Sequence, residues 1–304
     1  MADTSQNSTT AAAAKYWDSQ MSANKAYRLR WWDDRTTLQH INRLVIGRPI
    51  DGIHAGFHDC IGKFSGGRMD RAISVGCGVA AKEMDLVKKG FVGHFDFFEI
   101  SPASIERGKH IAELNGITSQ LAFNQGGFED APMTGDYDLV YWNNALHHMP
   151  DVVESLVWSK KQLRAGGLFA MDDFVGPTRF QWTEENLRWA NLVLATLSDR
   201  YLQSPHVPGT LVARQVGRPS PEYVAALDPS EAADSGRILD AMKVVFPDAT
   251  IIPTGGALYH LALNDLFCNF VTEDDLCVLN QILLLDGLLA EKGTTHYAVA
   301  FARK

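Results

Sequence analysis

The chain has 304 residues, of which 46% are hydrophobic and 21% are charged, so it can bury one large core without a second independent domain. Its formal net charge of -8 argues against a general nucleic-acid binder, because such proteins need clustered Lys and Arg. No apolar run approaches the roughly 20 residues of a membrane span, and the first residues lack the features of a signal peptide. The four cysteines show no C-x-x-C spacing, so we expect a cytoplasmic protein without a zinc site or disulfides.

Short apolar runs alternate with helix-compatible stretches from about residue 71 onward. The apolar runs predict strands at 72–75, 95–100, 120–123, 137–142, 168–175, 249–253 and 296–302. The stretches between them predict helices at 80–90, 102–115, 151–164, 236–244 and about 257–290. This alternation is typical of a doubly wound α/β fold. We expect a mostly parallel seven-stranded sheet with helices on both faces, an antiparallel last strand and helical lid elements.

The chain divides into five segments by composition and pattern. The prediction is a disordered N-terminus at 1–14 and a helical cap at 15–70. A sheet core that binds the ligand follows at 71–176, then a polar and Pro-rich lid insertion at 177–235 and the rest of the core at 236–304. The last segment holds a helical insertion at 255–291. Because the crevice of such a sheet lies beyond the carboxyl ends of its strands, both insertions can roof the site.

The first predicted strand leads directly into a glycine loop and then a helix. Gly76 and Gly78 let the backbone approach a ligand closely, and the helix N-terminus offers free amides and a positive dipole end. Glu99 ends the next apolar run, where a carboxylate can accept hydrogen bonds from both hydroxyls of a ribose. Its alternative role is to cap the helix that begins near Pro102. The pair of features predicts a nucleoside site, which a dinucleotide oxidoreductase would also have.

Five ordered motifs between residues 71 and 175 resemble those of the class I methyltransferases that depend on S-adenosylmethionine (SAM). The motifs are VGCGVA (75–80), Glu99, GGFED (126–130), YDLVYWNNALHHMPD (137–151) and LRAGGLFAMDD (163–173). The resemblance implies SAM as the cofactor. By position in these motifs, the residues expected to bind it are Gly76, Cys77, Gly78, Glu99, Ile100, Gly127, Phe128, Asn143 and Asn144.

Two positions depart from the family pattern. Ser74 stands where the family usually has an acid, two residues before the first motif glycine, so a contact to the amino group of SAM must come from elsewhere. Gly127 stands where many relatives have an Asp near the adenine, which leaves Phe128 to stack and Glu129 or backbone groups to form hydrogen bonds. Glu83, in the following helix, is a candidate for holding a backbone group near the glycine loop.

Two histidines are the candidates for catalysis. His148 could take a proton from an oxygen or nitrogen acceptor, since the unperturbed pKa of histidine, about 6.5, suits that task, and His260 is an alternative base. A purely structural role for His148 is the alternative. Trp32, Arg179 and Tyr259 are expected to contact the acceptor.

Two adjacent aspartates lie near the end of the fifth predicted strand. Asp172 and Asp173 could form a small metal site with His148, because carboxylate and imidazole are suitable ligands. The alternative is that one aspartate caps the loop and the other forms local hydrogen bonds. No separate ligand cluster supports a metal, so we expect none.

The resemblance implies in-line transfer of a methyl group to a small acceptor, most simply O- or N-methylation of a sugar, lipid or secondary metabolite. The segments 173–183 and 253–261 look similar to those of bacterial methyltransferases associated with glycosyltransferases or natural-product pathways. A basic segment from Lys15 to Arg48 favours an anionic acceptor. The alternatives are a macromolecular acceptor, a non-catalytic SAM-binding protein and an NAD-dependent oxidoreductase. The apolar stretch 257–290 could form a lid or a homodimer interface.

Overall fold

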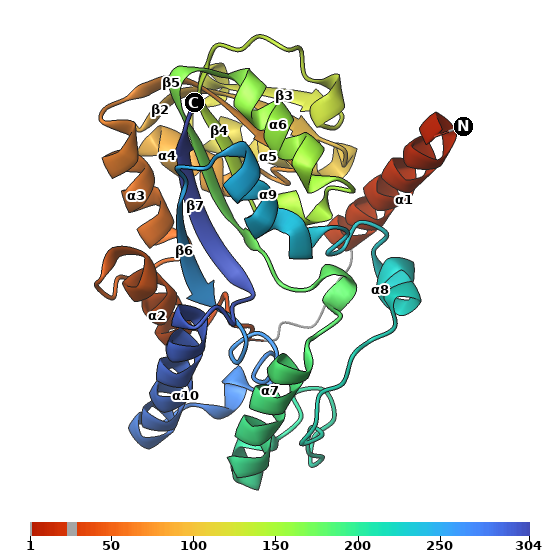
Figure 1. Cartoon of the computed structure of the whole chain (residues 1–304), viewed down its shortest axis with the longest axis vertical. Coiled ribbons are helices and arrows are strands. Elements are labelled where there is room, and N and C mark those ends of the chain that lie inside the picture. Colours follow the sequence, from red (N-terminus) through yellow and green to blue (C-terminus); the bar gives the residue numbers. More distant parts are fainter. Residues whose placement is uncertain (1, 23–28) are drawn as a thin grey trace.

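The computed structural model describes residues 2–22 and 29–304, and its centre is a seven-stranded sheet with the strand order β3-β2-β1-β4-β5-β7-β6 (Figure 1). β7 runs antiparallel to both neighbours, whereas the other pairs are parallel. The predicted fold class, with its antiparallel last strand, is therefore confirmed. The strands are β1 Met69–Val75, β2 Val92–Glu99, β3 Leu121–Gln125, β4 Tyr137–Asn143, β5 Leu163–Phe174, β6 Thr250–Gly255 and β7 Tyr297–Arg303.

Helices cover both faces of the sheet. The apolar sides of α3, α4 and α5 pack on one face, and those of α6 and α9 pack on the other. None of the described helices is both long enough and apolar enough to cross a membrane. The α-helices are α1 Ala2–Ser22, α2 Arg35–Ile46, α3 Ala55–Ser65, α4 Ala81–Lys88, α5 Pro102–Leu114, α6 Val152–Gln162, α7 Glu184–Thr196, α8 Pro221–Leu227, α9 Ile238–Val245 and α10 Glu273–Glu291.

Polar side chains fix where several of these helices begin. Asp34, Ser101 and Asp151 each accept a hydrogen bond from the amide three residues later, at the starts of α2, α5 and α6. Thr183 and Thr272 form reciprocal capping boxes at the starts of α7 and α10. Each cap satisfies amides that have no partner within the helix, which is why the helices start at these residues.

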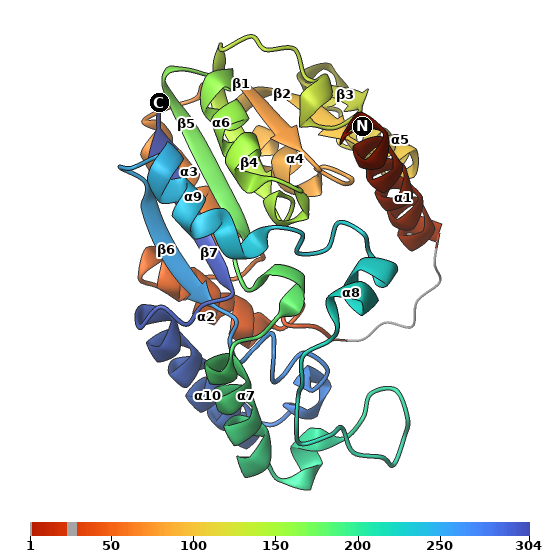
Figure 2. The same cartoon turned by 45° about the vertical axis from the view of Figure 1, so that its right-hand side comes forward.

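A further apolar cluster lies beyond the carboxyl end of β5. It joins α7 and α10 to the irregular segment 256–271 and to the start of β7. α7 and α10 lie at the same end of the molecule, below the sheet in both views (Figure 2). The predicted lid segment 177–235 contributes α7 and α8, and its chain passes along the edge of the sheet where the crevice was expected.

Two sequence-based expectations differ from the structure. Residues 1–14 were expected to lack structure, but Ala2–Ser22 form α1, which packs against α5. The predicted helix over 257–290 exists only as α10, because residues 256–271 form buried turns. Asp286 of α10 accepts hydrogen bonds from the amides of Gly256 and Leu258, at 2.9 and 2.6 Å, and these bonds hold the segment out of a helix.

Candidate active site

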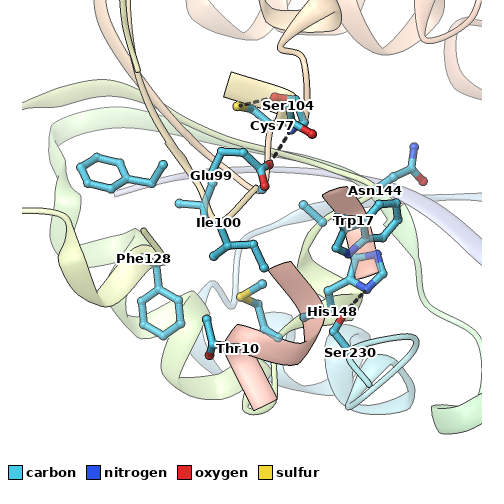
Figure 3. Close-up of a pocket in the computed structure, with 18 of the residues that line it drawn as sticks. Thr10, Trp17, Cys77, Glu99, Ile100, Ser104, Phe128, Asn144, His148 and Ser230 are labelled. Carbon is cyan, nitrogen blue, oxygen red and sulfur yellow. Dashed lines mark hydrogen bonds between the residues drawn. The ribbon is translucent and has the colours of Figure 1, made fainter. Parts of the chain in front are cut away.

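A cavity of about 690 Å³ lies at the carboxyl edge of β1, β2, β3 and β4. The loops after these four strands form its floor and walls. Part of its cover comes from α1, which contributes Thr10, Ala13 and Trp17, and part from the segment 229–233 (Figure 3). This volume is within the range of cavities that enclose a small ligand. All nine residues predicted to bind SAM line this one cavity: Gly76, Cys77, Gly78, Glu99, Ile100, Gly127, Phe128, Asn143 and Asn144.

The glycine loop takes a conformation that few side chains tolerate. Gly76 and Gly78 have φ of 64° and 57°, in the left-handed region that favours glycine. A Cβ on Gly76 would also come within 3.1 Å of the Cβ of Ala145. Ala80, directly before α4, has φ of 56° despite its side chain. The loop therefore stores backbone strain at the cavity floor, as functional loops often do.

The carboxylate of Glu99 is oriented by backbone amides. Its Oε2 accepts from the amide of Gly78 at 2.7 Å, and its Oε1 accepts from the amide of Ser101 at 2.8 Å. Burial raises the pKa of Glu99, and the bonds from these amides oppose that rise. The capping role and the ligand-binding role are thus compatible, because each carboxylate oxygen has a second lone pair.

The loop after β3 places an aromatic ring in the cavity wall. Phe128 is buried and packs against Trp158, with ring centroids 5.5 Å apart. Asp130 Oδ2 accepts from the amide of Gly127 at 2.9 Å and so closes the turn. A Cβ on Gly126 would come within 2.4 Å of the Asp130 carboxylate, which explains the glycine there.

Asn143 connects the cavity floor to a buried polar chain. Its side-chain oxygen accepts from Lys82 Nζ at 2.7 Å, and its side-chain nitrogen donates to the hydroxyl of Tyr141 at 3.0 Å. The Tyr141 hydroxyl lies 3.2 Å from His58 Nε2, and His58 Nδ1 lies 3.1 Å from Asp85 Oδ2. The rotamer of Asn143 is therefore fixed on both sides, which preorganises this part of the floor.

The loop after β4 is held by the fully buried Asp173. This carboxylate accepts from the amides of Ala145 and Leu146 at 2.9 and 2.8 Å, and its Oδ1 lies 2.5 Å from His147 Nδ1. Burial acts to lower the pKa of His147, but the adjacent Asp173 raises it above its ordinary value. Asp173 thus has the local structural role that was the alternative to metal binding.

His148 lines the cavity beside the covering helix. Its ring packs edge-on against Trp17, with centroids 5.4 Å apart, and its Nδ1 lies 3.1 Å from the hydroxyl of Ser230 (Figure 3). Burial, with the neighbouring His147, holds the pKa of His148 well below its ordinary value. The imidazole is therefore neutral near pH 7 and can accept a hydrogen bond.

Arg179 lines the cavity, but its guanidinium is already engaged. It donates to the carbonyls of Pro229 and Glu231, both at 2.7 Å. Arg179 also has φ of 51°, a strained conformation for a side-chain-bearing residue. The residue predicted to contact the acceptor therefore holds the covering segment 229–233 in place.

Trp32, Tyr259 and His260 lie outside the cavity, contrary to the expectation that they meet at the site. Trp32 is 42% exposed. Tyr259 is fully buried, and its hydroxyl donates to the carbonyl of Thr254 at 3.2 Å. His260 lies among aromatic rings such as Trp182, and burial lowers its pKa to about 3. Apolar packing in the cluster that joins α7 and α10 explains why Tyr259 and His260 lie away from the cavity.

One group of possible metal ligands is present in the described part of the chain. Ligand atoms of His147, His148 and Glu231 lie within 4.8 Å of one another. His147 Nδ1 is already paired with Asp173, and Asp172 Oδ2 pairs with His54 Nδ1 at 2.6 Å. The trio of the two aspartates with His148, which was considered for a metal and not favoured, is therefore not the group that the fold assembles.

Sequence reasoning missed several residues at or beside the cavity. Ser230 reaches it from a segment far from the motifs, and no local pattern marks it. Lys82 has a clearer signal, because it is a charged residue in the first turn after the glycine loop. His54 was also missed. His54 Nε2 is buried and has no hydrogen-bond partner among the described residues.

The segment that forms the floor of the cavity matches a known protein family. Residues 68–208 match the family model described as a methyltransferase domain. A geranyl diphosphate C-methyltransferase from Streptomyces coelicolor A3(2) has a TM-score of 0.55 at 12% identity, over 97% of this chain and 97% of that chain. The [4+2]-cyclase SpnF has a TM-score of 0.50 at 12% identity, over 97% of this chain and 96% of that chain. At such low identity, these two likenesses show a shared fold.

Proposed function

Because residues 68–208 match a methyltransferase domain, we propose that this protein transfers a methyl group from SAM to an enclosed small-molecule acceptor. The family match supports the resemblance inferred from the five motifs, and with it SAM as the cofactor. It favours this class over the oxidoreductase alternative. The observation that carries the proposal is the gathering of all nine expected cofactor residues around one cavity.

The residues present fit the cofactor. SAM supplies a methyl group bonded to a positively charged sulfur. Glu99, already oriented by two amides, has lone pairs left for the ribose hydroxyls. Phe128 offers a ring face to the adenine, and Asn143 and Asn144 would lie beside the methionine part.

The small size of the acceptor is inferred from the cover over the cavity. α1 and the segment 229–233 both lie over it, and Arg179 fixes the latter by two hydrogen bonds. A covered cavity excludes water from the reacting groups and leaves little room for a macromolecule. His148 is our candidate for accepting a proton from an oxygen or nitrogen acceptor, because it is the histidine that lines the cavity.

Two finer predictions have less support. The basic segment behind the anionic-acceptor prediction has Arg30, Arg35 and Arg48 each paired with an aspartate, and residues 23–28 of that segment lie outside the described residues. The homodimer prediction is consistent with Leu284 and Leu288 of α10, which are 64% and 47% exposed beside a groove between α2 and α10.

The test is transfer of a radioactive methyl group. The purified protein is incubated with methyl-labelled SAM and a bacterial extract, and the products are separated by size. Label in the low-mass fraction, lost with Glu99→Ala, is the expected result. Label in protein or nucleic acid would support the macromolecular alternative instead. No label, with binding of SAM retained, would favour the non-catalytic alternative.

A further inference from the structure

The methionine half of SAM carries an ammonium and a carboxylate, and both need partners inside a closed cavity. A buried ammonium without a negative partner is strongly unfavourable. Glu99 is held at the amides of Gly78 and Ser101 and serves the ribose in the proposed function. Position 74, on β1 directly before the glycine loop, holds a neutral serine. A negative partner for the ammonium would therefore have to be another residue near this floor.

Ser74 and Glu83 form one buried unit behind the cavity floor. The hydroxyl of Ser74 donates to Glu83 Oε1 at 2.8 Å, which joins β1 to α4. Glu83 is 2% exposed, and its Oε2 has no hydrogen-bond partner in residues 2–22 and 29–304. Burial raises the pKa of Glu83, whereas the charge of Lys82 and the Ser74 hydrogen bond lower it. A buried carboxyl with one unpaired oxygen is costly, and a cationic ligand would remove that cost.

Lys82, next to Glu83, lines the cavity itself. Its Nζ donates to the backbone and side-chain oxygens of Asn143, at 3.2 and 2.7 Å. Burial lowers the pKa of Lys82, and the charge of Glu83 opposes that change. The start of α4 thus places one acid and one base together at the end of the glycine loop. Their signs are complementary to the two charged groups of an amino acid.

We propose that Glu83, oriented by Ser74, binds the ammonium of the cofactor's methionine half, while Lys82 binds its carboxylate. This inference rests on the proposed function and assigns the acid that position 74 lacks. The hydroxyl of Ser74 keeps the Glu83 carboxylate against β1, and the second oxygen, which has no partner in the described residues, is the one that we assign to the ammonium.

The test compares two ligands that differ only at this end. S-adenosylhomocysteine has the ammonium and the carboxylate, whereas 5′-methylthioadenosine has neither and keeps the adenosine and the thioether. Both are titrated into the full chain by calorimetry. In Glu83→Gln, the Kd of S-adenosylhomocysteine is expected to rise roughly 10- to 100-fold, as for loss of a charged hydrogen bond. The Kd of 5′-methylthioadenosine is expected to stay unchanged. Glu222→Gln, at an exposed acid of α8, is the matched control and should change neither value.

Lys82→Gln tests the other half of the proposal. Decarboxylated SAM keeps the ammonium and lacks the carboxylate. Its affinity should fall in Glu83→Gln and stay unchanged in Lys82→Gln, whereas the affinity of S-adenosylhomocysteine should fall in both. An equal loss of affinity for decarboxylated SAM in the two variants would contradict the assignment of Glu83 to the ammonium and Lys82 to the carboxylate.

A relocation experiment separates binding from a structural role. Ser74→Asp combined with Glu83→Ala moves the acid from α4 to β1 and should regain most of the affinity that Glu83→Ala loses. If the affinity for both ligands falls equally in Glu83→Gln, or if the relocated acid restores no affinity, Glu83 only supports the loop and the inference is wrong. If the wild-type protein binds neither ligand, the proposed function fails as well.

Discussion

Replacing Asp173 by Asn should disturb both the stability of the fold and the cofactor site. The carboxylate accepts hydrogen bonds from the amides of Ala145 and Leu146 and pairs with His147, and these residues belong to the loop that follows β4. Asn has the same size, but it offers one acceptor oxygen, and its amide nitrogen would face another donor. The loop that contributes Asn144, Ala145 and His148 to the cavity would then lose its anchor.

The expected magnitude follows from the burial of the pair. Asp173 is 0% exposed, and the loss of one partner of a buried ion pair costs about 3–5 kcal/mol. For 304 residues, an unfolding entropy of about 2.1 cal/mol/K per residue gives about 0.64 kcal/mol/K, so the Tm should fall by about 5–8 °C. Binding of S-adenosylhomocysteine should weaken as well. Asp248→Asn, at an exposed acid, is the control and should leave the Tm unchanged.

The pH dependence of this loss tests its cause. The pKa of His147 is raised in the fold above its ordinary value of 6.5. Its contribution is therefore fully present below pH 6.5 and is lost as the pH rises through the folded-state pKa. The Tm difference between wild type and Asp173→Asn, measured by calorimetry, should be largest near pH 6 and smaller at pH 9. A Tm loss no larger than that of Asp248→Asn, or one that grows with pH, would show that the buried pair of Asp173 with His147 does not stabilise the fold.

Three further outcomes are expected. Ala80→Gly relieves the left-handed conformation before α4 and should raise the free energy of unfolding by up to about 1 kcal/mol in urea titrations; a decrease would show that Ala80 is unstrained. Trp17→Ala opens the cover and should weaken S-adenosylhomocysteine binding with little change in the Tm of the ligand-free protein; unchanged affinity would contradict a covering role for α1. Burial lowers the pKa of His58 and His296 to about 4 and that of His260 to about 3, so stability should fall as the pH drops below 6.5, by up to about 1.4 kcal/mol per pH unit for each histidine; urea midpoints that hold constant from pH 7 to pH 5 would argue against neutral burial.

The sheet and the cofactor-side residues could be predicted because their signals are local. A buried parallel strand is a short apolar run, and Gly76, Gly78 and Glu99 lie at fixed places relative to two such runs. The order of the strands then follows from the fold class. The family match and the strand order support this part of the prediction.

The cover and the acceptor side could not be predicted because they depend on contacts between distant segments. Trp17 reaches His148 across most of the first half of the chain, and Arg179 is taken up by carbonyls near residue 230. The segment 256–271 is mostly apolar, so its composition fits a buried helix and buried turns equally well. Only the hydrogen bonds to Asp286 decide between them.

Parallel calorimetric titrations test whether the cavity binds SAM through Glu99. SAM, S-adenosylhomocysteine and NAD are titrated into the wild-type protein and into Glu99→Ala. The wild type should bind SAM and S-adenosylhomocysteine, Glu99→Ala should lose both, and neither protein should bind NAD. Binding of NAD alone, or SAM binding that is unaffected by Glu99→Ala, would contradict the assignment of this cavity to SAM.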